Sequence, residues 1–173
     1  MMLFYRLDDA GGARGAELPA GVQARLWRPA SDGFPPPGSR SLRNAVWWAF
    51  ARLGLFARPD FVEITLWRGG ERLHRLIVTP RWLRFPFMAA DDLQLGDLWT
   101  HPGARGQGLA RAAIALAHRR FAGRRFWYLV RSDNPASIRL IESCGYRLVG
   151  TGRRTSPLGI RIAGRFRLET RAG

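Results

Sequence analysis

The stretch from Thr100 to Arg120, "THPGARGQGLARAAIALAHRR", decides the fold. It opens with a Pro-Gly turn, passes two glycines one residue apart, and continues as an alanine-rich segment. After the second glycine, apolar residues recur at helical spacing, at Leu109, Ala112, Ala113, Leu116 and Ala117. The pattern predicts a bare loop that leads directly into a helix beginning near residues 106–108.

The start of such a helix is suited to binding an anion. Its first turn carries amide hydrogens without intrahelical partners, and the helix dipole makes that end positive. Glycines also let a ligand approach the backbone closely, so we expect a diphosphate there. The loop is neither a P-loop, because the chain has no lysine, nor a dinucleotide fingerprint, because Arg111 stands where a third small residue is needed.

The composition is that of a folded protein. The chain has 173 residues, of which 46% are hydrophobic and 12% aromatic, and we expect one domain over residues 1–173. No apolar run is long enough to cross a membrane. A single cysteine excludes an internal disulfide framework, which favours a cytoplasmic location. The three histidines lack metal-ligand spacing, so no metal site is expected.

The net charge of +15 comes with 28 basic residues, all of them arginine. An arginine-rich solvated surface explains this charge, and so does a site whose forked donors bind phosphate. Both explanations remain open together. Since no helix-turn-helix, zinc-finger or RNP-like pattern is present, we expect no specific nucleic-acid partner.

The remaining segments alternate between strand and helix patterns. Residues 61–80 read as a hairpin that turns at Gly69-Gly70. Residues 133–145 read as a helix that Asn134 caps at its start and Gly145 ends. Apolar residues from Leu42 to Leu53 also fit helical spacing. We therefore predict an α+β fold with strands at 3–7, 21–29, both arms of 61–80, 91–102, 125–131, 146–154 and 159–170, and helices within 40–56, from 108 and within 133–145.

Two motifs in this order resemble the GNAT superfamily of N-acetyltransferases. The family's acetyl-CoA loop reads Arg/Gln-x-x-Gly-x-Gly/Ala after a strand, and Arg105–Ala110 fits each fixed position. The family's Asn-x-x-Ala/Ser, followed by a helix and Gly-Phe/Tyr, is matched by Asn134–Ser137 and Gly145–Tyr146. The strand "RFWYLV" lies between the two motifs, as that fold requires.

The resemblance implies a mixed, mostly antiparallel sheet of six to seven strands flanked by about four helices. Residues 91–151 would form the acetyl-CoA-binding core, and residues 1–90 the variable acceptor-side half. The fourth strand of the family binds the pantetheine arm, and the glycine loop binds the pyrophosphate. Carried over, the cofactor-binding residues are Leu98, Trp99, Thr100, Arg105, Gly106, Gln107, Gly108, Leu109, Ala110, Asn134 and Ser137.

The implied reaction is direct acetyl transfer to a primary amine, which must lose a proton. Family members often use a glutamate and a tyrosine as base and acid, but Gln94 and Ile141 occupy those positions here. Asp97 is the nearest carboxylate on the predicted strand and our candidate for the catalytic base. Glu63, on the hairpin, is the second candidate and lies on the acceptor side.

Trp47 and Trp48 would line the acceptor pocket and stack on the substrate, although core packing or a helix lying on a membrane explains the same aromatic segment. A small amine such as an amino sugar is the expected acceptor. A protein N-terminus or side chain is the rival substrate. A non-catalytic acyl-CoA- or nucleic-acid-binding module on this fold is the other alternative. The sequence leaves a homodimer open.

Overall fold

The computed structural model describes residues 1–9, 16–35, 41–155 and 164–170. Its strands form one sheet in the order β2-β3-β4-β5-β6-β1-β7-β8. The elements are β1 Met2–Leu7, β2 Gln23–Trp27, α1 Leu42–Arg52, β3 Val62–Arg68, β4 Glu71–Pro80, β5 Leu93–Thr100, the 3₁₀ turn η1 Pro102–Ala104, α2 Leu109–Arg120, β6 Phe126–Arg131, α3 Pro135–Ser143, β7 Arg147–Thr155 and β8 Arg165–Thr170.

This architecture confirms the α+β fold and the predicted order of elements. The described residues contain eight strands and three α-helices, whereas the family resemblance gave six to seven strands and about four helices. The counts taken from the family are therefore slightly wrong, while the strands and helices predicted segment by segment are present. Residues 159–163 of the last predicted strand lie outside the described residues.

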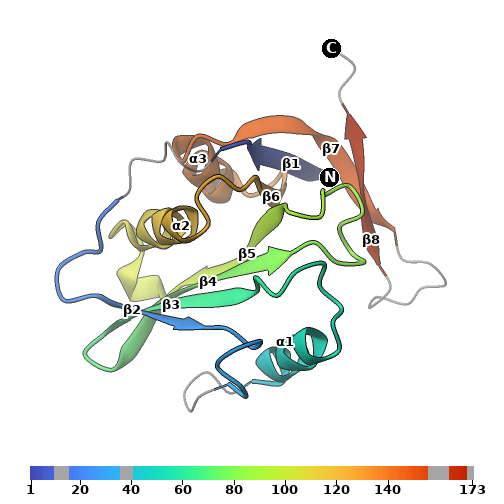
Figure 1. Cartoon of the computed structure of the whole chain (residues 1–173). Helices are drawn as coiled ribbons and strands as arrows, with labels where there is room; N and C mark the ends of the chain where they lie inside the picture. Colours follow the sequence, from blue (N-terminus) through green and yellow to red (C-terminus); the bar gives the residue numbers. More distant parts are fainter. Residues whose placement is uncertain (10–15, 36–40, 156–163, 171–173) are drawn as a thin grey trace.

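The sheet is mixed, and its single parallel ladder joins β5 to β6 among the described strands. β1, from the start of the chain, lies between β6 and β7 and pairs with both in antiparallel register (Figure 1). The glycine loop and α2 connect β5 to β6 and provide the long crossover that a parallel pair requires.

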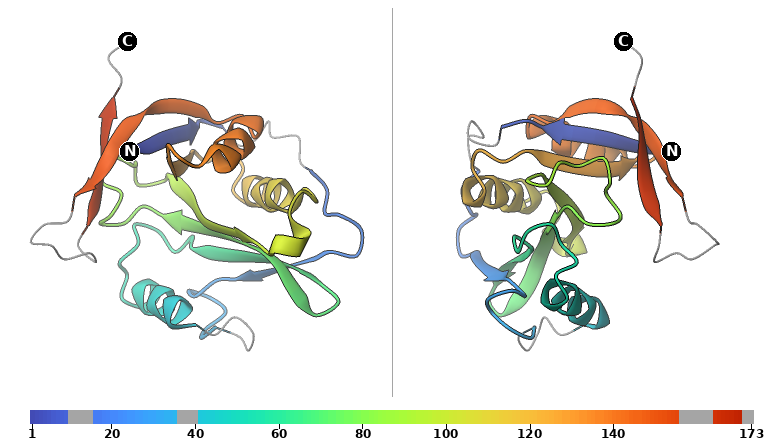
Figure 2. Two further views of the ribbon diagram at one scale, coloured as in Figure 1. Left: turned by 180° about the vertical axis from the view of Figure 1, so that it is seen from behind. Right: turned by 45° about the vertical axis from the view of Figure 1, so that its right-hand side comes forward.

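Helices cover both faces of this sheet, α1 on one side and α2 on the other (Figures 1 and 2). On the α2 side, side chains such as Leu93, Leu95 and Ile114 form an aliphatic core, and each is at most 1% exposed. On the α1 side the buried cluster is largely aromatic and includes Trp82 and Trp127. The two cores place an aliphatic layer beneath the glycine loop and an aromatic layer on the opposite face.

The buried face of α1 differs from the simple apolar stripe in its sequence. Leu42, Val46 and Leu53 share helical spacing, yet they are 84%, 42% and 72% exposed. Asn44, which is 1% exposed, points inward instead, and Trp47 packs against the aromatic cluster. The bulk of the aromatic rings and the hydrogen bonds of Asn44 therefore decide which face of α1 meets the sheet.

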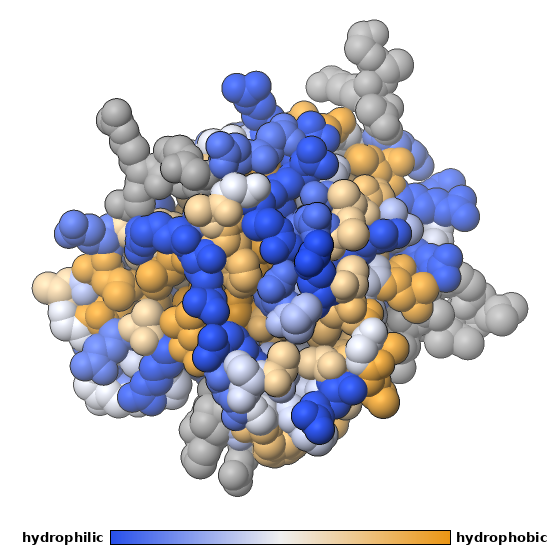
Figure 3. Space-filling view, in the orientation of Figure 1, coloured by the Kyte–Doolittle hydropathy of each residue, from blue (hydrophilic) through white to orange (hydrophobic). Residues whose placement is uncertain are grey.

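The surface in Figure 3 carries hydrophilic residues over most of the visible face, with hydrophobic residues in smaller patches between them. Many exposed arginines form local ion pairs, such as Arg28 with Asp32 at 3.0 Å and Arg131 with Asp133 at 2.5 Å. Both observations fit an arginine-rich solvated surface.

Two histidines are buried on the α2 side of the sheet. His118 is 1% exposed, and its Nε2 lies 2.8 Å from the hydroxyl of Tyr146. His74 is fully buried, and its Nδ1 lies 2.8 Å from Oγ1 of Thr100. Burial lowers the pKa of each histidine from 6.5 to about 4.

These histidines predict a pH-dependent stability. As pH falls from about 6.5 to 4, His74 and His118 become protonated in the unfolded chain but stay neutral in the folded chain. The free energy of unfolding should therefore decrease by a few kcal/mol over this range. Below about pH 4 both states are protonated, and this contribution decreases no further. Urea unfolding at a series of pH values measures the effect. The glutamine of His118→Gln cannot titrate, so the free energy of unfolding of this variant should decrease less steeply with falling pH. The same pH dependence in both proteins, or no pH dependence in the parent protein, would contradict the role given to the buried histidines.

Candidate cofactor and acceptor site

The central feature of the site is the opening between β5 and β6. Their parallel ladder has only three pairs, in which Leu93–Leu95 pairs with Phe126–Tyr128. Beyond these pairs β6 continues along β1, while β5 continues along β4 as far as Thr100. The β6-facing backbone edge of residues 98–100 is therefore available to an added extended chain.

A β-bulge marks the point at which β5 leaves β6. The register between β4 and β5 shifts between Arg75 and Ile77, opposite Asp97. Asp97 has a φ of 51° and is the one non-glycine residue with positive φ among the described residues. Aspartate tolerates this left-handed conformation better than most residues, and a bulge bends the strand and redirects its side chains.

The glycine loop lies across the opening from this edge. Gly106 and Gly108 have φ values of 79° and 74°, and an added Cβ would meet no atom within 4 Å at either position. Gly108 directly precedes α2 and has no side-chain cap, so the first-turn amides of α2 have no such partner. The loop combines an open approach with donors, as the sequence predicts.

Two adjoining hollows of about 450 and 360 Å³ occupy the space between the loop, β5 and α3. They share Thr100, Arg105, Ala110 and Leu140. Gln107 is absent from both linings because its side chain contacts Arg68 and the carbonyl of Gly103. The predicted cofactor-binding residues that the structure brings together here are Leu98, Trp99, Thr100, Arg105, Gly106, Gly108, Leu109, Ala110, Asn134 and Ser137.

Asn134 and Ser137 have additional structural roles. Asn134 Oδ1 accepts a hydrogen bond from the Ser137 amide at 3.1 Å, which confirms the predicted helix cap. The Ser137 side chain forms a hydrogen bond with the hydroxyl of Tyr128 on β6, and burial raises the pKa of Tyr128. Nothing in the sequence distinguishes Tyr128 from other aromatic residues of a buried strand, so this contact was not predicted.

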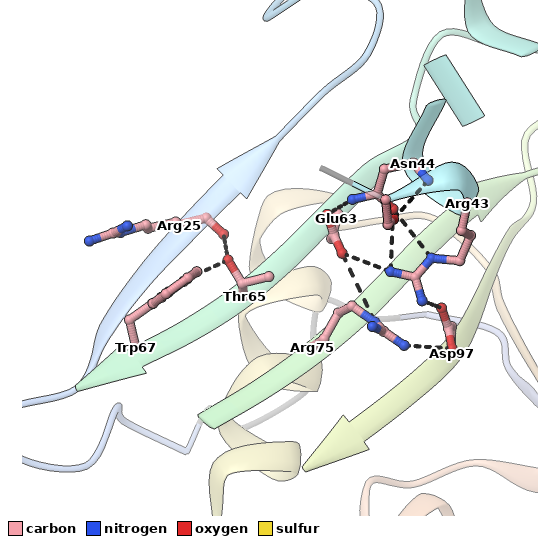
Figure 4. A network of polar contacts seen from close by, with 9 residues as sticks. Arg25, Arg43, Asn44, Glu63, Thr65, Trp67, Arg75 and Asp97 are labelled. Atoms are coloured by element: carbon pink, nitrogen blue, oxygen red, sulfur yellow. Dashed lines mark hydrogen bonds and ion pairs between the residues drawn. The ribbon is translucent and has the colours of Figure 1, made fainter. Parts of the chain in front are cut away.

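Asp97 belongs to a polar cluster on the α1 side of the sheet (Figure 4). Arg43 Nη1 donates to Asp97 Oδ2 at 2.5 Å, and Arg75 Nη2 donates to Asp97 Oδ1 at 2.9 Å. Glu63, 1% exposed, accepts from Asn44 Nδ2 at 2.8 Å and from Arg43 at 3.4 Å. Burial raises the pKa of Glu63, and the charge of Arg43 opposes the shift. The cluster joins α1 to three neighbouring strands.

A smaller cavity of about 140 Å³ adjoins this cluster and contains Trp47, Gln94, Gly96 and Asp97 in its wall. A Cβ at Gly96 would come 2.8 Å from the side-chain nitrogen of Gln94, so glycine leaves room for that amide. The predicted acceptor residue Trp47 and the predicted base Asp97 therefore meet at one cavity.

Three other residues that the sequence singles out lie away from that cavity wall. Trp48 packs against Phe34, with ring centroids 5.5 Å apart, and Glu63 lies within the polar cluster. Ile141, at the family's tyrosine position, is fully buried in the aliphatic core. Within residues 1–9, 16–35, 41–155 and 164–170, no group of three His, Cys, Asp or Glu side chains is arranged to hold a metal, and no helix is long and apolar enough to cross a membrane.

Comparison with known proteins gives a family and a fold. Residues 64–146 match the model of the acetyltransferase (GNAT) family. No curated protein sequence matches the chain. Among solved structures, a Drosophila protein is 21% identical with a TM-score of 0.56, and 85% of this chain covers 47% of that one.

Two further solved structures are of proteins named as GNAT-type acetyltransferases. A GCN5-related N-acetyltransferase from Kribbella flavida is 18% identical with a TM-score of 0.51, over 84% of this chain and 53% of that one. A tandem GNAT protein from the clavulanic acid biosynthesis pathway is 15% identical with a TM-score of 0.51, over 85% and 50%. The chain spans about half the length of these structures, and the likeness is one of fold.

The family match covers β4, β5, the glycine loop, α2, β6 and α3, which are the elements that form the opening and both hollows. Members of this family use acetyl-CoA as a co-substrate. Residues 64–146 of the chain therefore belong to the GNAT family of acetyltransferases.

Proposed function

We propose that this protein transfers an acetyl group from acetyl-CoA to the primary amine of a small molecule. The observation that carries the proposal is the free edge of β5 facing the glycine loop. The pantetheine arm pairs with the backbone of residues 98–100, as an added strand would. The pyrophosphate lies at the amides of residues 106–110, where the start of α2 and its dipole favour negative charge.

The reaction forms one bond and breaks another. The amine nitrogen attacks the thioester carbonyl carbon, the new C–N bond replaces the C–S bond, and the thiolate leaves with the electron pair. The amine loses one proton, and the thiolate gains one. Holding both reactants in adjoining pockets lowers the barrier even without a strong base or acid.

Asp97 is our candidate for the residue that takes the amine proton. Each of its oxygens accepts one hydrogen bond from an arginine, which leaves a second lone-pair site on each oxygen for the amine or an intervening water. Its side chain is 41% exposed and lines the smaller cavity. Asp97 is also next to Leu98 and therefore close to the strand edge that would hold the thioester.

The size of the smaller cavity favours a small acceptor. Its volume is about 140 Å³, which suits a small molecule better than a protein segment. This observation supports a small amine over a protein as the acceptor.

A substitution in the glycine loop tests the pyrophosphate site. Gly108→Val places a β-branched side chain on the approach to the loop, so acetyl-CoA affinity should fall at least tenfold, or about 1.4 kcal/mol. Calorimetric titration with acetyl-CoA gives the dissociation constant. Gly123→Val is the matched control, because Gly123 also has positive φ, 77°, and open space around it but lies at the far end of α2.

Both variants introduce similar backbone strain, so the comparison separates strain from obstruction. The proposed site predicts weak binding only in Gly108→Val. Equal acetyl-CoA affinity of the two folded variants would show that the pyrophosphate does not bind at this loop.

A substitution at Asp97 tests the removal of the amine proton. Asp97→Asn preserves the shape and tolerates the left-handed backbone while it removes the charge. Turnover should fall by about 10²-fold, and the dissociation constant for acetyl-CoA should change little. Release of CoA thiol measures turnover, and Asp32→Asn, which removes a carboxylate paired with Arg28, is the control. Undiminished turnover by Asp97→Asn would eliminate Asp97 as the base.

A further inference from the structure

The smaller cavity on the α1 side has two chemically different walls. One wall comes from β5 and contains Gln94, Gly96 and Asp97. The other comes from the segment after β4 and contains Trp82, Arg84 and Phe85. Because Asp97 is next to Leu98 on the free edge of β5, the first wall lies beside the proposed thioester position. The second wall would then contact the part of the acceptor that does not react.

Buried donors without partners gather around this cavity. The indole Nε1 atoms of Trp47 and Trp82 and the Nε atom of Arg84 are buried and have no hydrogen-bond partner within the described chain. All three residues line the cavity. Indole and guanidinium groups can only donate, and buried donors are almost always paired. A ligand that supplies acceptor oxygens would satisfy them once small side-chain movements bring the three nitrogens to the cavity surface.

The charge of Arg84 points to an anionic ligand. Its guanidinium carbon lies 4.8 Å from the ring centroid of Trp82, so the cation and the indole form one surface. Burial and the nearby charge of Arg154 both lower the pKa of Arg84. Among the described residues, no carboxylate forms an ion pair with Arg84. An anion in the cavity would offset both unfavourable effects.

The β5 wall has the opposite character. Asp97 presents a carboxylate to the cavity, and Gln94 presents a side-chain amide. These groups suit an amine, whereas Arg84 and the two indoles suit an anion. A ligand that carries both groups would thus be oriented with its amine toward the free edge of β5.

The volume limits the size of that ligand. A water molecule occupies about 30 Å³ in the liquid, so a cavity of about 140 Å³ has room for roughly five water molecules. Glycine and alanine both fit within this volume.

We propose that this cavity binds a small amino acid as the acetyl acceptor, with its amine at Asp97 and its carboxylate accepting hydrogen bonds from Trp47, Trp82 and Arg84. The proposal rests on the proposed function for its reaction, but the recognition of the carboxylate is separable from it. Acetyl transfer to this acceptor yields an N-acetyl amino acid and free CoA.

The kinetic test compares acceptors with and without a carboxylate. The kcat/KM values for glycine and L-alanine are measured against methylamine and ethylamine, each calculated on the concentration of neutral amine. The amino acids should be at least tenfold better substrates. Trp82→Phe keeps an aromatic ring, although a smaller one, and removes the N–H, so it should reduce the advantage of glycine severalfold while methylamine changes little.

Two further variants sharpen this comparison. Arg84→Gln should reduce the preference for glycine over glycinamide, because the cation distinguishes a carboxylate from an amide. Trp67→Phe is the matched control, since the Trp67 indole already donates to Thr65 at 2.8 Å and lies outside the cavity wall (Figure 4). Methylamine turnover equal to that of glycine, or a glycine preference that survives both Trp82→Phe and Arg84→Gln, would overturn the proposal.

A binding test does not depend on turnover. With CoA bound, N-acetylglycine should bind at least tenfold more tightly than N-methylacetamide, and Trp82→Phe should reduce that difference. Equal affinities would overturn the carboxylate subsite even if the enzyme acetylates other amines. Absence of turnover with every acceptor, together with selective N-acetylglycine binding, would reject the proposed reaction but retain the subsite.

Discussion

The early divergence of β5 from β6 is the constraint on which the site depends. A parallel ladder that stops after three pairs leaves the backbone groups of residues 98–100 without a strand on that side. β5 stays paired with β4 on both sides of the bulge at Asp97, and the aliphatic core beneath α2 supports the glycine loop on the other side of the opening. Closing the ladder would satisfy the strand edge but remove the space for an extended cofactor. The incomplete sheet is therefore the basis of the proposed binding site.

The same bulge connects this opening to the other face of the sheet. The carboxylate of Asp97 contacts Arg43 from α1 and Arg75 from β4, so the end of the proposed cofactor edge is tied to the helix on the proposed acceptor side. Glu63 and Asn44 extend these contacts beneath α1. A change in α1 can thus alter the acceptor cavity without touching the glycine loop. This arrangement permits the acceptor side to vary while the cofactor side keeps its form.

Local sequence signals were sufficient for most of the fold and for the elements that form the proposed cofactor side of the site. The glycine loop, the helix that follows it and the Asn134 cap each depend on neighbouring residues, and all three appear at their predicted positions. The acceptor side depends on contacts between distant segments. No local pattern indicates that Asn44 is buried while Leu42 and Leu53 remain exposed, or that Trp82 and Arg84 join Trp47 around one cavity. The bulge likewise depends on distant residues, because it results from the register between β4 and β5.

Amide hydrogen exchange with and without acetyl-CoA tests the central claim most directly. The proposed binding mode places the pantetheine arm against the backbone of residues 98–100 and the pyrophosphate at residues 106–110. Exchange at Leu98 or Thr100, and at the loop amides, should therefore slow at least tenfold when acetyl-CoA is bound, while exchange at the exposed edge strand β2 stays unchanged. Protection that is absent from β5 and the loop, or that appears only elsewhere in the protein, would contradict the account.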